Sequence, residues 1–377
     1  MSQNDSIKNF SYVGFGRIAA IGLQALFYFI LAALLEPESY GELSVIVALA
    51  GTFSVISTFG LNVSLQVYVA KKNSTLSNQI NTLFVISTTI AGLILLPMNP
   101  LGALLCVSMS LFSMNQFNLM GLKQYKNFML NALLKSSTYV IIPLLLYFVL
   151  EIPGIVLGMA ISNLIASIPF FKTLRLKKFF ELKNYYRVLI HNFGVAISGT
   201  LPFVVDKLLI APLFGLFIVG VYQFNLQIFF ALGILPGVLG SYLVSEESGG
   251  TTHKKISYLV ILCSVVLAVI TIFAAPYFVN AIFPKYSDGI LGLQVMVIAI
   301  IPQAVASVFG AKLLAKESTK IGYSAIVQVG SLLLLIALLG NLYGLVGLGI
   351  AVLISQAANT LFLYALYRRS IGPKTIE

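Results

Sequence analysis

Charged residues, cysteine and histidine are all scarce in this sequence. Only 9% of its 377 residues are charged, whereas soluble domains carry roughly 25%. The two cysteines, Cys106 and Cys263, both fall in apolar stretches, and there are two histidines, so we expect neither a disulfide framework nor a metal site. The sequence also lacks a phosphate-binding glycine loop, a nucleophile elbow and a zinc-protease helix. These absences argue against those enzyme classes and predict no cofactor.

Hydrophobic residues are abundant instead, at 59% of the chain. They form stretches of about twenty residues, the length that crosses a hydrocarbon core of roughly 30 Å as a helix. The sequence therefore predicts an all-α, polytopic membrane protein with twelve transmembrane helices. We place the spans near 11–35, 39–62, 78–96, 100–120, 128–150, 153–171, 188–211, 217–243, 256–275, 289–311, 320–340 and 345–366.

The net charge of +11 would suggest a nucleic-acid partner in a soluble chain. Here the cations stand in the short loops between spans, and all Lys and Arg except Lys207 and Lys285 fall toward one side of the predicted membrane. The positive-inside rule then predicts a multi-pass protein of the cytoplasmic (plasma) membrane with both termini in the cytoplasm. No nucleic-acid partner is expected.

A basic segment divides the chain in two. Residues 172–187 form the longest cation-rich stretch and separate six predicted spans in 1–171 from six in 188–377. This segment is either a cytoplasmic linker facing lipid headgroups or a specific site for lipid phosphates or a partner.

The two halves show weak internal similarity. A shift of 179 residues places 34–41 on 213–220 and so aligns Gly41 with Gly220. Because each half has an even number of spans, both would enter the membrane in the same orientation. We expect two parallel six-helix lobes around a central cavity, which is a transporter architecture.

Asp206 and Lys207 are adjacent in an otherwise apolar run. Neighbours on a helix point about 100° apart, so we expect that the two cannot share one face and that at least one has a partner elsewhere. Lys207 can reach outward to the interface, whereas the short Asp206 cannot. Asp206 is therefore expected either to face a water-filled cavity or a cation, or to belong to a structural pair.

Arg17 and Lys135 are further cations inside predicted spans. The Arg17 guanidinium suits bidentate binding of phosphate oxygens, and reaching the cytoplasmic interface is the alternative. Lys135 lies about 10 Å along its helix, and we place it at the substrate cavity.

Uncharged polar residues cluster in the second and eighth spans, at matching places in the two halves. They either line a hydrated path for sugars or hydrogen-bond within helix pairs. The candidates for the substrate cavity are Asn62, Gln66, Tyr222, Gln223 and Asn225. A hinge is predicted at Pro236 and Gly237, with close helix packing as the alternative.

Four segments resemble the polysaccharide flippases of the multidrug/oligosaccharidyl-lipid/polysaccharide exporter superfamily. They are Leu34-Leu-Glu-Pro-Glu-Ser-Tyr-Gly-Glu-Leu43, Gly121-Leu-Lys-Gln-Tyr-Lys126, Asp206-Lys207 through Val219-Gly-Val-Tyr222, and Gly344-Leu-Val-Gly-Leu-Gly349. The resemblance spans essentially the whole chain. It implies two lobes in a V shape, with Arg17, Asp206 and Lys207 bordering the central cavity. The chain departs from the peptidoglycan-precursor flippases in having twelve expected helices and not fourteen.

The expected function is therefore transport and not enzymatic catalysis. The resemblance implies a flippase that moves a polyprenyl-(di)phosphate-linked oligosaccharide to the outer leaflet by alternating access. Its partners would be that lipid-linked oligosaccharide, membrane lipids, a coupling ion (proton or sodium) and glycan-assembly proteins.

Two alternatives remain. One is an ion-coupled drug or cation antiporter of the same superfamily. The other is a membrane glycosyltransferase that uses Glu36 and Glu38, which the tight predicted outer turns disfavour.

Overall fold

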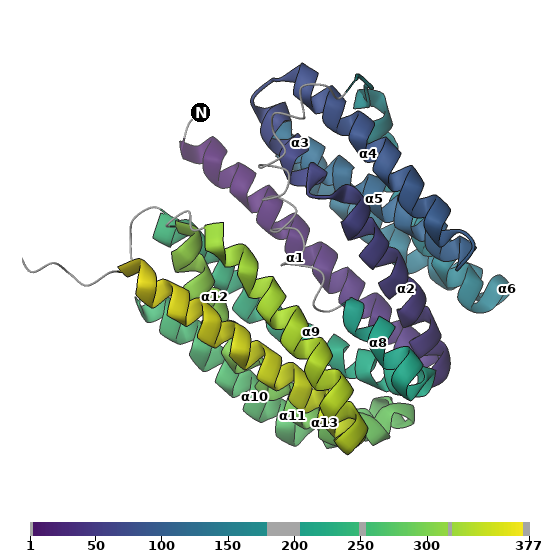
Figure 1. The fold of residues 1–377 in the computed structure, drawn as a ribbon, viewed down its shortest axis with the longest axis vertical. Coiled ribbons are helices and arrows are strands. Elements are labelled where there is room, and N and C mark those ends of the chain that lie inside the picture. The colour runs from purple at the N-terminus through teal and green to yellow at the C-terminus, as the bar shows by residue number, and fades with distance from the viewer. Residues whose placement is uncertain (1–2, 179–203, 249–253, 316–318, 372–377) are drawn as a thin grey trace, which may run out of the picture. The chain divides into compact units, whose positions relative to one another are not determined.

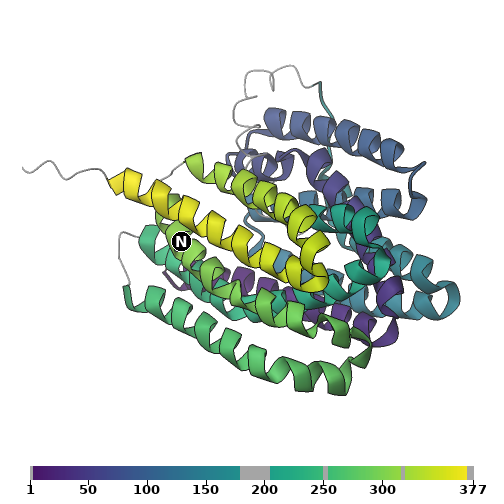
Figure 2. The same ribbon diagram turned by 60° about the horizontal axis from the view of Figure 1, so that its bottom comes forward.

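The computed structural model of the protein describes residues 3–178, 204–248, 254–315 and 319–371. In these ranges all regular structure is helical, as expected (Figure 1 and Figure 2). The α-helices are α1 (Gln3–Leu34), α2 (Pro37–Thr58), α3 (Leu61–Ala70), α4 (Ser74–Leu95), α5 (Pro100–Gly121), α6 (Tyr125–Thr173), α8 (Val205–Phe214), α9 (Leu216–Ser248), α10 (Lys254–Ile282), α11 (Ile290–Ile298), α12 (Ile300–Ala315) and α13 (Tyr323–Ile371). Short 3-10 helices occupy Pro284–Gly289 and Thr319–Gly322.

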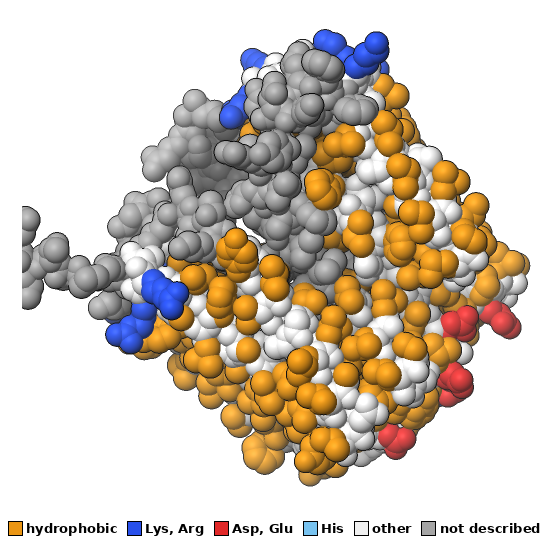
Figure 3. Space-filling view, viewed as in Figure 1, with side chains coloured by type: hydrophobic (Ala, Val, Ile, Leu, Met, Phe, Trp, Pro, Cys, Tyr) orange, Lys and Arg blue, Asp and Glu red, His pale blue; other side chains and the backbone are white. Residues whose placement is uncertain are grey.

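The helices have the length and the surface of membrane spans. Nine helical stretches within the described ranges are long and apolar enough to cross a bilayer. Large apolar side chains stand exposed on their flanks, where Phe148 is 77% and Tyr277 80% accessible, and Figure 3 shows such side chains spread over the helix surfaces. Surfaces of this kind are solvated by lipid. The chain is a multi-pass membrane protein.

Two of the nine stretches are helical hairpins. α6 is interrupted at Glu151 (φ 53°, ψ −136°) and α13 at Gly344 (φ 55°, ψ −132°), so each comprises two spans. Both interruptions fall at turns that the sequence predicts. The seventh expected span, 188–211, lies mostly outside the described residues, and the count of twelve stays a prediction.

The second span differs from its expected course. α2 ends at Thr58, Phe59 and Gly60 adopt positive φ values of 46° and 69°, and α3 continues from Leu61. The expected single span over 39–62 is therefore wrong at its C-terminal end, because two consecutive left-handed residues interrupt the helix. This break places Asn62 and Gln66 on the separate helix α3.

Local side-chain chemistry fixes where α4 and α5 begin. The Asn73 side chain accepts a hydrogen bond from the Leu76 backbone N–H at 3.0 Å, and Asn99 accepts from Gly102 N–H at 2.7 Å. Pro100 follows Asn99 at the first helical position, where its missing N–H costs nothing. Asn99 and Pro100 belong to a turn that the sequence predicts between two spans.

The chain forms two compact units. The first comprises residues 1–28 and 45–205, and the second comprises 29–44 and 206–377. In the second unit α9, α10, α11, α12 and α13 pack side by side. The segment 29–44 packs with this unit, although it precedes the predicted division at 172–187. That division into sequence lobes stays a prediction.

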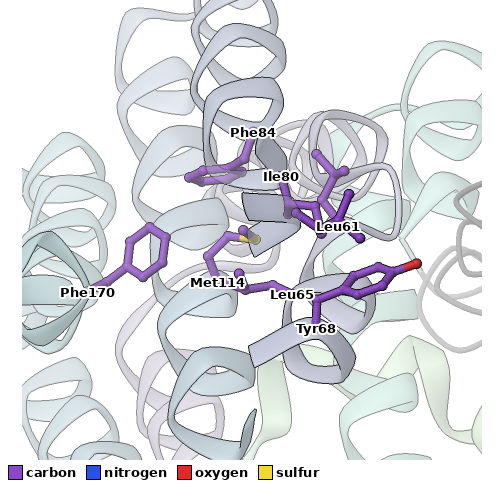
Figure 4. Packing of buried hydrophobic residues seen from close by; sticks show 8 residues of the cluster. Leu61, Leu65, Tyr68, Ile80, Phe84, Met114 and Phe170 are labelled. Atoms are coloured by element: carbon purple, nitrogen blue, oxygen red, sulfur yellow. The ribbon is translucent and has the colours of Figure 1, made fainter. Parts of the chain in front are cut away.

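A hydrophobic cluster holds α3 in the first unit (Figure 4). Leu61 and Leu65 of α3 pack with side chains of α4, α5 and α6, and the rings of Phe84 and Phe170 meet edge to face at 6.1 Å. The remaining members of the cluster are Tyr68, Leu76, Ile80 and Met114. Because α3 is anchored in this way, the position of its residue Gln66 is fixed.

Candidate functional site

The first unit contains a cavity of about 260 Å³. Four helices line it: α1, α3, α5 and α6. The lining residues are Ala20, Ile21, Gln24, Gln66, Phe112, Gln116, Phe117, Met120, Phe128, Ala132, Lys135 and Ser136. The structure thus brings together Lys135 and Gln66, two of the residues that the sequence placed at a substrate cavity.

Helical spacing explains why these residues converge. On α6 the lining positions 135 and 136 stand three and four residues after 132, which itself stands four after 128, so all of them lie on one side of the helix. On α1 the lining positions 20, 21 and 24 do the same. Position 17 belongs to that face of α1, one turn toward the N-terminus. The Arg17 side chain lies outside the described part of the structure.

Lys135 is a buried cation held by aromatic rings. Its side chain is 9% exposed, and its Nζ lies 3.8 Å from the centre of the Tyr139 ring and 5.6 Å from that of Phe112. Among the described residues, no carboxylate forms an ion pair with it. A ring face attracts an ammonium group without cancelling its charge. The cavity wall therefore retains a positive charge that an anion can neutralise.

A network of side-chain amides connects α5 to α6, both before and after the interruption of α6 at Glu151. Asn131 Oδ1 accepts from Asn115 Nδ2 at 3.0 Å and from Gln116 Nε2 at 2.7 Å. Asn131 Nδ2 and Asn115 Nδ2 both donate to the Ala166 carbonyl, at 2.7 and 2.9 Å. Interhelical hydrogen bonds of this kind fix the helices that carry Gln116 and Lys135.

Asp206 and Lys207 lie in the second unit and bond to each other. Lys207 Nζ is 3.1 Å from Asp206 Oδ1, and the Tyr222 hydroxyl donates to Asp206 Oδ2 at 2.8 Å. Although successive helical residues point apart, the long lysine side chain reaches back to the carboxylate of its neighbour on α8. The expectation of a further partner is confirmed in Tyr222. Asp206 is fully buried, as the structural-pair alternative requires.

The remaining predicted cavity residues have local partners. Asn62 Nδ2 donates to Ser113 Oγ at 3.0 Å, Gln223 Nε2 to Gln227 Oε1 at 3.2 Å, and Asn225 Nδ2 to the Gly289 carbonyl at 3.0 Å. None of these three residues lines the cavity of the first unit. Their bonds match the alternative of hydrogen bonding between and within helices.

The predicted hinge residues lie inside α9. The helix runs from Leu216 to Ser248 through Pro236, which is buried, whereas Gly237 is exposed. A hinge at this position stays a prediction.

Sequence reasoning missed Gln24, Gln116 and Tyr139. A single amide or phenol in an apolar span is a weak signal, because most such groups satisfy one another within the bundle. The available clue was the spacing of Gln24 seven residues after Arg17, which places both on one face of α1.

Within the described ranges, no group of three or more His, Cys, Asp or Glu side chains could hold a metal ion.

The chain is similar to known proteins in structure but not in sequence. No protein-family model matches the chain, and no curated protein sequence matches it. The lipid II flippase MurJ in an inward closed conformation is similar, with a TM-score of 0.78 and 13% identity over 96% of this chain and 87% of that one. An inward-facing multidrug resistance MATE family transporter of the MOP superfamily gives 0.66 and 14% over 94% of both chains. A MATE crystal structure in complex with MaD5 gives 0.61 and 13% over 97% of this chain and 96% of that one. The chain has the fold that flippases and drug transporters of the MOP superfamily share, as its resemblance to the polysaccharide flippases predicted.

Proposed function

We propose that this protein is a flippase that moves a polyprenyl-phosphate- or diphosphate-linked oligosaccharide from the cytoplasmic to the outer leaflet by alternating access. The observation that carries the proposal is Lys135, a cation in the wall of a membrane-embedded cavity with no carboxylate partner among the described residues. A charged side chain at this depth costs roughly 2.5 to 3.5 kcal/mol on insertion scales. An anionic cargo offsets that cost while it is bound.

Arg17 would add a second cation near the cavity. Its position continues the cavity-lining face of α1, so a second cation would stand one turn from Ala20 and Ile21. One lysine balances one negative charge, and a guanidinium adds bidentate binding of a second phosphate. Lys135 and Arg17 together suit a diphosphate linkage, while Gln24, Gln66 and Gln116 offer amide groups near it for sugar hydroxyls.

The composition of the cavity wall also bears on the drug antiporter alternative. A cationic cargo needs carboxylates to replace its lost hydration, and none of the lining residues that the structure describes is acidic. The fold is shared with MATE transporters, so the fold does not separate the two functions, but the charge of the wall favours the flippase.

We propose that the rest of the machinery follows the sequence prediction. Lobes of residues 1–171 and 188–377, joined by the cytoplasmic linker 172–187, would enclose a central cavity. The Asp206, Lys207 and Tyr222 cluster would serve as a gate or as a switch coupled to protons or sodium. Glycan-assembly proteins would deliver the cargo.

A complementation experiment tests the proposal. A deletion strain should lose its surface glycan and accumulate the lipid-linked precursor, and the wild-type gene should reverse both. Lys135→Met at equal expression should fail to do so. Lys312→Met is the matched control, because Lys312 also lies near a ring, 5.4 Å from the centre of Tyr367, yet is not among the residues that line the cavity. Normal glycan with altered dye efflux in the deletion strain would overturn the flippase in favour of the antiporter.

A further inference from the structure

Aromatic rings contact the Lys135 ammonium where a buried lysine would ordinarily have a carboxylate. In the first unit, the carboxylate whose side chain is described is Glu151. It lies on α6, as Lys135 does, but sixteen residues farther along the helix. That separation corresponds to about 24 Å along an α-helix. Tyr139, by contrast, stands four residues after Lys135 on the same face of α6, and Phe112 approaches from α5.

The Tyr139 ring is itself held in place. The Phe27 ring of α1 meets it edge to face, with centroids 5.3 Å apart and an interplanar angle of 73°. Its face is thereby presented to the Lys135 ammonium at 3.8 Å. The contact orients the ammonium on one side and leaves its other N–H donors available, because a ring face engages a cation without accepting all of its hydrogen bonds.

A ring and a carboxylate have opposite consequences for ligand choice. A carboxylate would cancel the lysine charge, and an incoming anion would have to displace it. A ring stabilises the ammonium and keeps the charge of the site at +1. Such a site attracts anions and repels cations, so the choice of ring sets specificity as well as stability.

We propose that Tyr139 is a positioning residue that holds Lys135 as an uncompensated cation and makes this part of the cavity a subsite for one phosphate group. The inference rests on the proposed function and adds to it the residue that sets charge selectivity. The ligand chemistry is a phosphate monoester or diester, carried either on a lipid or in solution.

Binding of two matched lipids tests this subsite. The full-length protein in detergent is titrated with a polyprenyl monophosphate and with the corresponding uncharged polyprenol. The wild type should prefer the phosphate, and Lys135→Met should lose that preference. Tyr139→Leu should reduce the preference about tenfold, since a desolvated cation–π contact contributes on that scale. Tyr139→Phe, which keeps the ring, should retain most of it.

Tyr147→Leu is the matched control, because Tyr147 lies on the same helix but twelve residues from Lys135, about 18 Å along an α-helix. It should leave the preference for phosphate unchanged, and unfolding temperatures of all variants check that they remain folded. Competition by inorganic phosphate would assign the subsite to the free anion, and its failure to compete would assign it to the lipid-anchored group. Either result supports an anion subsite.

Two negative outcomes are distinguishable. If wild-type protein binds polyprenol as tightly as polyprenyl phosphate, the proposed function itself fails. If the wild type prefers the phosphate but Tyr139→Leu keeps that preference, or Tyr139→Phe loses as much as Tyr139→Leu, the positioning role fails while the flippase stands.

Discussion

At the scale of single residues, the Asp206 and Lys207 pair shows how a buried charge is accommodated in a membrane helix. Asp206 Oδ1 accepts from both the backbone N–H and the Nζ of Lys207, at 2.8 and 3.1 Å, while Oδ2 accepts from Tyr222. The carboxylate is therefore bonded on both oxygens. Removing one member of such a group leaves its partner charged and buried.

The expected stabilities follow from that arrangement. Asp206→Asn should lower the free energy of unfolding by about 3 to 5 kcal/mol, because the Lys207 ammonium loses its counter-ion. Tyr222→Phe removes one hydrogen bond to a charged group and should cost about 1.5 to 3 kcal/mol. Equilibrium unfolding of the purified variants in detergent measures both values.

The double variant Asp206→Leu/Lys207→Met controls for the charge. It removes both ions and should recover most of the stability that Asp206→Asn loses. A double variant as unstable as Asp206→Asn would show that packing, and not an uncompensated charge, is responsible.

Sequence reasoning reached part of the site at this scale. Lys135 and Gln66 were found because an ionisable or amide group in an apolar span is conspicuous. The contacts of Lys135 with Tyr139 and of Asp206 with Tyr222 were not predicted, because aromatic residues are common in spans and carry no signal of their own. Asn62 donates to Ser113, as most membrane amides bond to neighbouring helices, and its role at the central cavity stays a prediction.

At the scale of elements, α2 and α9 approach each other through two glycines. A Cβ atom added at Gly41 would lie 1.9 Å from the carbonyl oxygen of Leu216, and one added at Gly220 would lie 1.8 Å from that of Pro37. Real side chains do not tolerate such distances, so only glycine permits this crossing.

Alanine at either glycine should therefore separate the two helices. We expect Gly41→Ala and Gly220→Ala each to lower the unfolding free energy by about 1 to 3 kcal/mol, the usual cost of overpacking. Gly330→Ala on α13 is the matched control, because an added Cβ there meets nothing within 4 Å. That control should be neutral or stabilising by roughly 0.5 to 1 kcal/mol, as alanine favours helix. Thermal unfolding in detergent distinguishes the expected destabilisation at Gly41 and Gly220 from the neutral or stabilising effect at Gly330. Equal effects of all three substitutions would refute the close crossing.

Elements were the most predictable level of the structure, and their interruptions the least. Hydrophobic length predicts the spans, and turn residues such as Asn99 and Pro100 predict where they begin. The break after Thr58 was missed because Phe59 adopts a positive φ, which an aromatic residue rarely does and which no sequence rule anticipates.

At the scale of the whole molecule, the two halves of the sequence show matched structural details. The glycine crossing maps onto itself under the 179-residue shift, which takes Gly41 to Gly220 and Pro37 to Leu216. Reciprocal contacts of this kind arise where a two-fold axis relates two copies of one motif. They support the duplicated six-helix unit that the sequence predicts.

The two hairpins match as well. Three residues after its interruption each has a glycine, Gly154 and Gly347, whose added Cβ would lie 2.2 and 1.9 Å from the carbonyl oxygens of Leu146 and Leu339. These pairs are related by a shift of 193 residues, and the interruptions at Glu151 and Gly344 share nearly the same φ and ψ. The larger shift indicates additional residues between the two matched regions in the second half.

The predicted outer turns carry a contact that bears on the proposed transport cycle. Glu36 Oε1 and Lys285 Nζ form an ion pair at 2.8 Å. The neighbouring Tyr286 ring stacks on Phe224 at 4.5 Å and meets Tyr40 edge to face at 6.0 Å. All five residues belong to the second compact unit, to which the predicted first lobe contributes Glu36 and Tyr40. In the proposed alternating-access cycle the moving bodies part on each side in turn. If these bodies are the lobes predicted from the sequence, and not the two compact units, this contact must open once in every cycle.

Cross-linking tests that requirement. Cysteines are placed at positions 36 and 285 in a background where Cys106 and Cys263 are replaced by alanine, and a short cleavable cross-linker joins them. We expect the linked protein to lose transport of the lipid-linked oligosaccharide and to recover it when the linker is reduced. Each single-cysteine variant treated in the same way controls for modification alone. Because the ion pair itself is exposed and worth little, its loss should not impair transport. Full transport by the cross-linked protein would mean that this contact stays closed throughout the cycle, and the parting of the lobes would then have to occur elsewhere.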